Sequence, residues 1–110
     1  MIKADFYTNS QNILTGFVVT GHAGFADFGS DVCCASVSSA VMMTANTITD
    51  VFKINAEVVA EENEFSFKLQ EASSDADKVL LGLVIHLENL REEFGGLIKV
   101  QVHESPEKLH

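Results

Sequence analysis

The sequence predicts a two-layer α+β domain, in the order ββαββαβ, with two helices packed on one largely antiparallel or mixed sheet. Three observations lead to this fold class. Apolar and polar residues alternate in two paired stretches and in one later stretch, which indicates five strands. Two longer stretches carry apolar residues three and four positions apart, as amphipathic helices do. The 110 residues suffice for one core, so residues 1–110 are expected to form a single domain.

The strands are predicted from runs of alternating polarity that are separated by turn-forming residues. Residues 2–19 contain two such runs around the polar residues 9–12, which predicts a β-hairpin. Residues 56–69 contain two more runs around a short polar turn, which predicts a second hairpin. Residues 98–102 predict the last strand.

Both helices are predicted from apolar spacing and from residues that begin or end helices. Residues 31–52 contain neither glycine nor proline, and Ser30 or Asp31 is a natural N-cap for a helix there. Residues 75–94 place apolar side chains at spacings of three and four, and the two glycines at 95–96 end the run.

The second predicted helix has a wider apolar surface than contact with one sheet requires. Val79, Leu81 and Ile85 extend this surface beyond the main apolar stripe. A surface of this kind packs on the other helix or on a second subunit. We therefore expect a homodimer.

The composition is acidic and restricts the class of partner. Sixteen Asp and Glu residues against seven Lys and Arg residues give a formal net charge of −9. This charge repels a phosphate backbone, so nucleic acid is not expected as a partner. It suits a basic protein or peptide, although acidity also serves simply to keep a small domain soluble.

The apolar runs and the cysteines indicate the compartment. No apolar run approaches the roughly 18 residues that span a bilayer, and the first residues enter a strand without a signal-peptide core. We therefore expect a cytoplasmic protein with no membrane partner. Cys33 and Cys34 are adjacent, which is a poor geometry for an unstrained disulfide, so both are expected to be thiols.

Metal and nucleotide sites are not expected. His22, Cys33 and Cys34 offer at most three metal ligands, and adjacent cysteines on a helix point about 100° apart. The glycines of residues 21–29 match neither the P-loop pattern nor the dinucleotide-binding pattern. The sequence therefore predicts no metal and no cofactor.

Residues 20–38 hold the strongest group of reactive side chains. Cys34 is expected in the first turn of the first helix, where unpaired backbone N–H groups and the helix dipole favour thiolate over thiol. His22, in a glycine-containing loop, is a candidate to accept the thiol proton and later to protonate a leaving amine. The pair predicts a Cys-His dyad, with N–H groups at the helix start as oxyanion donors.

Asp31 and Ser38 are candidate supporting residues. Asp31 either orients His22 or is only an N-cap. Ser38 follows Cys34 by four residues on the same helical face, and its hydroxyl bonds either near the thiolate or back to the preceding turn. Structural roles are the alternatives for the dyad as well, since cysteine is commonly a small buried residue and a single histidine commonly structural.

Residues 21–38 resemble the signature of the ribosomal-processing cysteine protease family, Prp. In that family a Gly-His-Ala-Gly segment precedes a glycine loop and a helix start of the form Asp-x-x-Cys-Ala-x-x-Ser. Position by position, the catalytic histidine of the family falls on His22, the catalytic cysteine on Cys34 and the acidic position on Asp31. Cys33 stands where the family usually has an aliphatic residue, so this chain carries a second thiol beside the nucleophile.

The resemblance implies a substrate. Prp-like proteins remove a short N-terminal extension from the large-subunit ribosomal protein L-twenty-seven during ribosome assembly, are dimers and cover the site with their glycine loop. We expect Phe25 and Phe28 to contact an apolar side chain beside the scissile bond, with anchoring of the loop as the alternative. The substrate-binding residues expected on this basis are Gly21, Gly24, Phe25, Phe28 and Gly29.

Two other functions compete with the peptidase. One is a noncatalytic dimeric module that binds a basic ribosomal protein or assembly factor, with Cys34 a passive helix residue. The other is a thiol-based redox protein, which is disfavoured because no C-x-x-C motif occurs. Rapid alkylation of Cys34 that depends on His22 distinguishes the peptidase from the binding module.

Overall fold

The computed structural model describes residues 1–21 and 28–104, with residues 28–31 described by their backbone alone. The predicted order of elements is confirmed, with one short π-helical segment added after the first helix. The elements are β1 Ile2–Thr8, β2 Leu14–Thr20, α1 Phe28–Asn46, η1 Thr47–Val51, β3 Ala56–Glu61, β4 Glu64–Leu69, α2 Ser74–Phe94 and β5 Ile98–Glu104.

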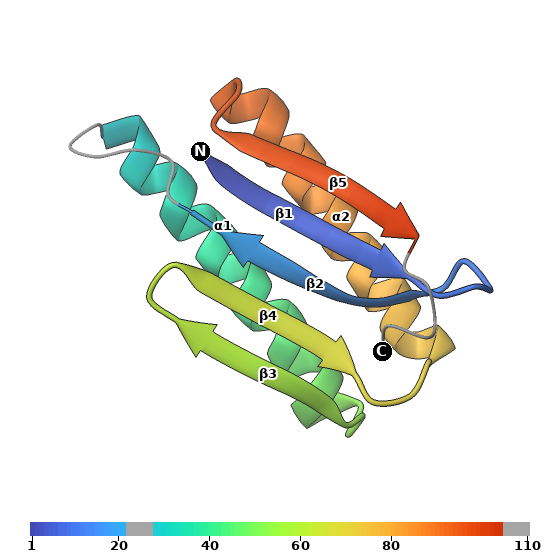
Figure 1. Ribbon diagram of the computed structural model, residues 1–110. Helices are drawn as coiled ribbons and strands as arrows, with labels where there is room; N and C mark the ends of the chain where they lie inside the picture. Colours follow the sequence, from blue (N-terminus) through green and yellow to red (C-terminus); the bar gives the residue numbers. More distant parts are fainter. Residues whose placement is uncertain (22–27, 105–110) are drawn as a thin grey trace.

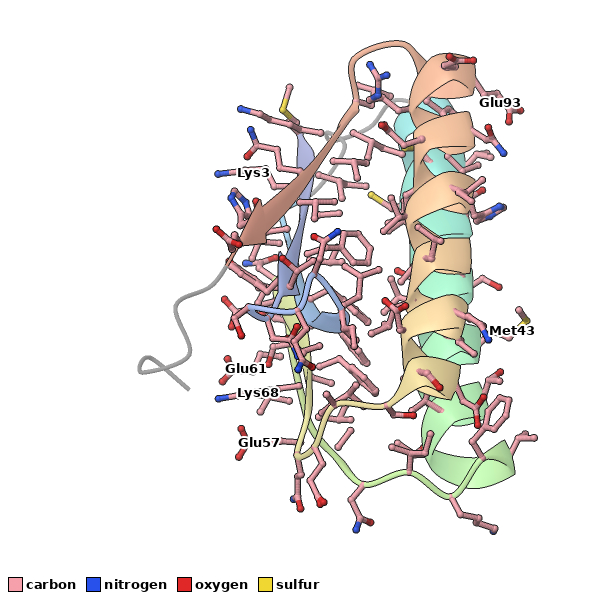
Figure 2. All side chains as sticks on the ribbon, turned by 90° about the vertical axis from the view of Figure 1, so that its right-hand side faces the viewer. Lys3, Met43, Glu57, Glu61, Lys68 and Glu93 are labelled. Carbon is pink, nitrogen blue, oxygen red and sulfur yellow. The ribbon has the colours of Figure 1, made fainter. Side chains whose placement is uncertain are left out.

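The five strands form one mixed sheet in the order β3-β4-β2-β1-β5. β1 and β5 run parallel, and all other neighbours run antiparallel. Both helices cover the same face of the sheet and leave its other face open (Figure 1). The two layers are seen from the side in Figure 2. The predicted two-layer α+β fold is confirmed, and the parallel β1–β5 pair makes the sheet mixed.

The hydrophobic core fills the space between the sheet and the helices. Phe6, Phe17 and Phe67 are register partners on β1, β2 and β4, with ring centroids 5.5 Å and 5.4 Å apart. From the helix layer, Leu80 and Leu87 are fully buried against them in the same core cluster. The alternating apolar residues of the strands and the helically spaced leucines thus pack on one internal surface.

The first helix begins earlier than the sequence predicts. α1 starts at Phe28, so Ser30 and Asp31 lie inside its first turn, and the interpretation of either residue as the N-cap is wrong. Gly29 is the weakest helix former in this turn, and a glycine costs only about 1 kcal/mol relative to alanine. The local cap signal is therefore too weak to stop the helix at residue 30 or 31.

The end of the first helix near Phe52 is confirmed, but the last turn is π-helical. The Phe52 N–H donates to the carbonyl oxygen of Thr47 at 3.0 Å, which is a step of five residues. The hydroxyl of Thr49 donates to the carbonyl oxygen of Ala45 at 3.0 Å, a back-bonding that bends helices. Lys53, with φ 59°, turns the chain out of the helix.

The second helix is capped at both ends. The Ser73 side chain accepts a hydrogen bond from the Ala76 N–H at 3.2 Å, and Gly95 ends the helix in the left-handed conformation, with φ 46°. In the first turn, the Asp77 carboxylate accepts the Leu14 N–H at 2.8 Å. This contact joins the start of α2 to the start of β2.

The helical stretch Val32–Val51, which runs from α1 through η1, is long and apolar enough to cross a membrane, by length and composition alone, with a mean hydropathy of 1.3. The expectation that no apolar run approaches this length is therefore wrong. In the fold, the stretch packs on the sheet through Val37, Val41 and Ile48, which are buried in the core. Core helices of globular domains meet the same test of composition, and 33% of the apolar window is buried in this fold.

Candidate active site

Cys34 lies half-buried on α1, in the wall of a cleft of about 210 Å³. The cleft separates α1 from the β3–β4 turn, which comprises residues 61–64. Its floor is formed by residues of β1, β2 and β4, among them Val19 and Phe65. A thiol in this position is within reach of a ligand that enters the cleft.

Cys34 is the seventh residue of α1, counted from Phe28, and therefore lies in the second turn. The expectation that it lies in the first turn is wrong. The four unpaired N–H groups at this end of the helix belong to residues 28–31, one turn before Cys34. Helical side chains tilt toward the N-terminus, so the Cys34 side chain still leans toward the positive end of the dipole.

Cys33 occupies a different environment from Cys34. Its side chain is fully buried in the core, four residues before Val37 on the same stripe of α1. Burial raises the pKa of the Cys33 thiol, and the neighbouring Cys34 raises it further. Cys33 is therefore a protonated core residue at neutral pH, as expected for a structural cysteine.

Gly21 follows the last residue of β2 at the edge of the cleft. Its φ of 87° lies in the left-handed region, and its N–H donates to the carbonyl oxygen of Asn63 in the β3–β4 turn at 3.1 Å. A Cβ on Gly21 would lie 2.4 Å from the carbonyl oxygen of Met1, so only glycine fits there. The residue that precedes His22 in the chain is thus held between the β3–β4 turn and the start of β1.

The other predicted site residues divide into two groups. Ser38 lines the cleft one helical turn beyond Cys34, as its spacing predicts. Its supporting role remains a prediction. The remaining predictions cannot be compared with the structure. His22, Gly24 and Phe25 lie outside the described residues, and Phe28, Gly29 and Asp31 are described by their backbone alone.

Two parts of the cleft were not predicted from the sequence. Met42 continues the line of Cys34 and Ser38 along α1, and it was assigned no role. The β3–β4 turn forms the opposite rim, although it follows Cys34 in the chain by more than 25 residues. The only signal in the sequence was the run of acidic residues around the predicted turn.

No metal centre is present among the residues that the structure describes, since none of their His, Cys, Asp and Glu side chains form a group of three or more that could hold an ion. A pair formed by one histidine and one aspartate does lie on the open face of the sheet. His103 lies 2.8 Å from the Asp5 carboxylate and stacks on Tyr7 at 5.3 Å between ring centroids. This pair belongs to β5 and β1 and does not line the cleft of Cys34.

Comparison with known proteins identifies the family. Residues 1–99 match the family model described as cysteine protease Prp. The ribosomal processing cysteine protease Prp of Staphylococcus aureus is 22% identical over 103 residues, which cover 91% of this chain and 97% of that protein. The protein of the same name from Bacillus subtilis is 25% identical over 107 residues, which cover 91% of this chain and 96% of its own.

Solved structures share the fold. Prp from S. aureus with a covalently linked product peptide has a TM-score of 0.84 at 22% identity, covering 94% of this chain and 100% of that chain. The same protease with a substrate peptide has a TM-score of 0.80 at 19% identity, covering 96% and 100%. The SMU.848 protein of Streptococcus mutans has a TM-score of 0.78 at 20% identity, covering 96% of both chains.

The two-layer fold and a cysteine in the wall of its cleft define a small α+β cysteine peptidase. The family model and the two named relatives each match about nine-tenths of this chain, and the matches cover almost the whole length of those relatives. The chain belongs to the family of cysteine protease Prp.

Replacing Gly21 with alanine is expected to lower peptidase activity by about tenfold or more, because β2 must shift at its end. The added Cβ meets the Met1 carbonyl oxygen, and the positive φ costs about 1–2 kcal/mol in addition. Gly96→Ala is the matched control, since Gly96 has φ 89° but nothing within 4 Å of its Cβ position. Kinetics on a peptide substrate and urea unfolding check both variants. Equal activity of the two variants would show that the close approach at Gly21 does not position the site.

Proposed function

We propose that this protein is the cytoplasmic peptidase that removes the N-terminal extension from a bacterial large-subunit ribosomal protein of the L-twenty-seven type during ribosome assembly. The observation that carries the proposal is the Cys34 thiol in the cleft wall of a chain that belongs to the Prp family. The named relatives are ribosomal processing proteases, and one of them binds substrate and product peptides. The net charge of −9 suits a basic ribosomal-protein precursor.

The proposed mechanism uses Cys34 as nucleophile and His22 as acid and base. The Cys34 thiolate attacks the scissile carbonyl carbon after His22 has taken the thiol proton. The tetrahedral intermediate collapses to a thioester, and His22 gives the proton to the leaving amine. A water molecule, deprotonated by His22, hydrolyses the thioester, and the proton returns to the thiolate. Asp31 orients His22, and Ser38 hydrogen-bonds near the sulfur.

The substrate-binding residues in this proposal come from residues 21–29, which include the start of α1. In this proposal Gly21, Gly24 and Gly29 lie beside the bound peptide, and Phe25 and Phe28 contact an apolar side chain beside the scissile bond. Gly21 supports this role, because it lines the cleft and is anchored to the β3–β4 turn.

The test is mass spectrometry of a synthetic peptide that carries the N-terminal extension, after incubation with the reduced protein. One discrete cut is expected, and His22→Ala is expected to remove it. A peptide that stays uncut beside folded protein would instead support the noncatalytic binding module. Random cuts at several sites would contradict a processing enzyme with a narrow substrate.

The protein is further proposed to act as a homodimer through the outer face of its helix layer. Leu81 and Ile85 of α2 are 48% and 55% exposed, and Met43 of α1 is 69% exposed and points away from the sheet (Figure 2). A groove of about 670 Å³ lies between the two helices and is lined at several positions by small residues, including Ala40 and Gly82. Large side chains beside a groove on the same face fit a second copy across a two-fold axis.

Ile85→Glu combined with Met43→Glu is expected to give a monomer at micromolar concentration, because two charges cannot be buried without partners at such an interface. Light scattering after size-exclusion chromatography measures the mass. Val102→Glu is the matched control, since Val102 is 53% exposed on the edge strand β5 and not on the helix layer. A monomeric wild type, or a dimer that survives the double variant, would contradict this interface.

A further inference from the structure

The proposed reaction needs a hydrogen-bond donor for the oxyanion that forms when Cys34 attacks a peptide carbonyl group. Cys34 cannot use its own backbone N–H, because it lies inside α1 and this N–H is bonded four residues back along the helix. The unpaired N–H groups of α1 belong to residues 28–31 and point along the helix axis, beyond its N-terminal end. A donor that faces Cys34 from across the cleft must therefore come from another element.

The helix side of the sheet ends, beside the cleft, in a row formed by Ile2 of β1, Gly21 after β2 and Asn63 before β4. The row follows from the register, because Val19 pairs with Phe65 on the helix side and successive residues alternate between the two faces. The Gly21 N–H donates to the Asn63 carbonyl oxygen at 3.1 Å and so continues the pairing of β2 with β4. The other two members are a glycine and a buried isoleucine, so Asn63 is the polar member of this row.

Alternation separates Asn63 from the glutamates of the same turn. Glu61 and Glu64 are register partners and point to the open face of the sheet, as Figure 2 shows for Glu61. Asn63 precedes Glu64 in the chain and therefore belongs to the opposite face, where it lines the cleft. Residue 21, directly opposite Asn63, is a glycine, so it places no side chain in the cleft.

Asn63 supplies a donor that the rest of this wall lacks. Among the described residues that line the cleft, only Ser38 and Asn63 carry a side-chain O–H or N–H group, apart from the Cys34 thiol itself. Ser38 lies on the same helix as Cys34, one turn away, whereas Asn63 faces both from the opposite rim. The cleft volume of about 210 Å³ is below the roughly 300–1,000 Å³ of sites for drug-sized ligands, so a carbonyl group bound at Cys34 lies close to this rim.

We infer that the side-chain amide of Asn63 donates a hydrogen bond to the oxyanion formed at Cys34. The inference rests on the proposed peptidase function. When the carbon–sulfur bond forms, the electron pair of the carbonyl double bond moves to oxygen, and the Asn63 N–H stabilises this charge without giving up its proton. When the carbon–nitrogen bond breaks, the pair returns to form the thioester carbonyl, and the leaving amine takes its proton from His22.

The surroundings of Asn63 suit this role. Ile2, Val19 and Phe65 give the cleft an apolar floor beside it. A fixed dipole in such a site stabilises developing charge more than the same dipole does in water. The hydrogen bond to Gly21 holds the backbone of Asn63 in place before any peptide binds. The donor is therefore positioned in advance of the reaction.

Asn63→Ala and Asn63→Asp test the donor. Aspartate favours turns as asparagine does and has nearly the same shape, but its carboxylate has no N–H. Both variants are expected to lower kcat for the extension peptide by about a hundredfold and to leave KM within about threefold of the wild type. Full activity of Asn63→Asp overturns the inference, because the turn and not the N–H is then what matters.

Ser66→Ala is the matched control. Ser66 lies on β4 three residues beyond Asn63, pairs with Val18 and does not line the cleft. Its replacement is expected to leave kcat within about twofold of the wild type. An equal loss of activity in Ser66→Ala and Asn63→Ala overturns the inference, because that result indicates a structural role for the hairpin.

Alkylation separates an effect on the oxyanion from an effect on the thiol. Iodoacetamide alkylates Cys34 without forming an oxyanion, so its rate is expected to change by less than about twofold in Asn63→Ala. Slower alkylation of Cys34 in this variant overturns the inference, because Asn63 then acts on the nucleophile and not on the oxyanion.

Peptide aldehydes separate this inference from the proposed function. The Cys34 sulfur adds to the aldehyde carbon and the thiol proton passes to oxygen, which gives a tetrahedral adduct without a leaving amine. In a series that ends at each residue of the extension in turn, the tightest aldehyde is expected to bind Asn63→Ala about ten- to a hundredfold more weakly than the wild type. Equal binding to both proteins, or binding to neither, overturns the inference.

The two proposals fail in different ways. Aldehyde binding that depends on Asn63, without cleavage of the extension peptide, supports the oxyanion donor and contradicts the peptidase. Discrete cleavage that Asn63→Ala leaves unchanged supports the peptidase and overturns the oxyanion donor.

Discussion

Cys34→Ala is expected to lower kcat/KM for the precursor peptide by about a thousandfold or more, because alanine cannot form the thioester. Cys33→Ala is the matched control. Cys33 is fully buried and burial raises the pKa of its thiol, so it takes no part in the attack. Its replacement is expected to cost about 1 kcal/mol of stability or less and to leave cleavage within about threefold of the wild type. Mass spectrometry under reducing conditions measures both rates.

Alkylation of the two thiols provides an independent measurement. Iodoacetamide is expected to label Cys34 first, since Cys34 is half-buried at the cleft and Cys33 is enclosed in the core. Cleavage that persists in Cys34→Ala would point to a contaminating protease. If Cys33→Ala lost cleavage and Cys34→Ala kept it, Cys33 would be the nucleophile, and the site as described would be wrong.

The different environments of the two cysteines could be predicted from local sequence alone. Cys33 falls four residues before Val37 on the apolar stripe of the helix, and this spacing places it in the core. Cys34, one residue later, is turned by about 100° and so leaves that stripe. The helical period therefore separates the buried thiol from the thiol at the cleft without knowledge of the fold.

The opposite rim of the cleft could not be predicted in this way. The β3–β4 turn reaches Cys34 because β4 pairs with β2, through partners such as Val19 and Phe65. Alternation of polarity is the same whichever strand is the neighbour, so it does not determine strand order. For the same reason, the sequence did not determine the parallel pairing of β1 and β5.

The start of α1 was missed because its signals compete locally. Ser30 and Asp31 favour a cap, while Phe28 and Gly29 carry no strong signal against a helix. A cap residue contributes about 1 kcal/mol, which is comparable with the cost of one glycine in a helix. Because these propensities are closely balanced, tertiary contacts decide at which residue α1 begins. The position of Cys34 within the helix depends on that boundary.

Phe17→Ala is expected to lower the free energy of unfolding by about 3–5 kcal/mol, the largest loss of stability that we predict for a single substitution in this domain. Phe17 is 1% exposed at the centre of the sheet. Its ring lies 5.5 Å from that of Phe6, 6.0 Å from that of Phe65 and 5.4 Å from that of Phe67. Alanine leaves a cavity among three rings that belong to two other strands, and those strands cannot close it without losing their register.

Urea unfolding at constant pH measures this loss, with Val59→Ala as the control. Val59 is 41% exposed on the edge strand β3, and its truncation is expected to change stability by about 0.5 kcal/mol or less. Phe17 also lies on β2, which ends one residue before Gly21, so a loosened β2 is expected to reduce cleavage even where the domain stays folded. A loss below about 1 kcal/mol would show that the site collapses around the smaller side chain. In that case the packing of Phe17 on the three neighbouring rings would not be required to position the end of β2 at the cleft.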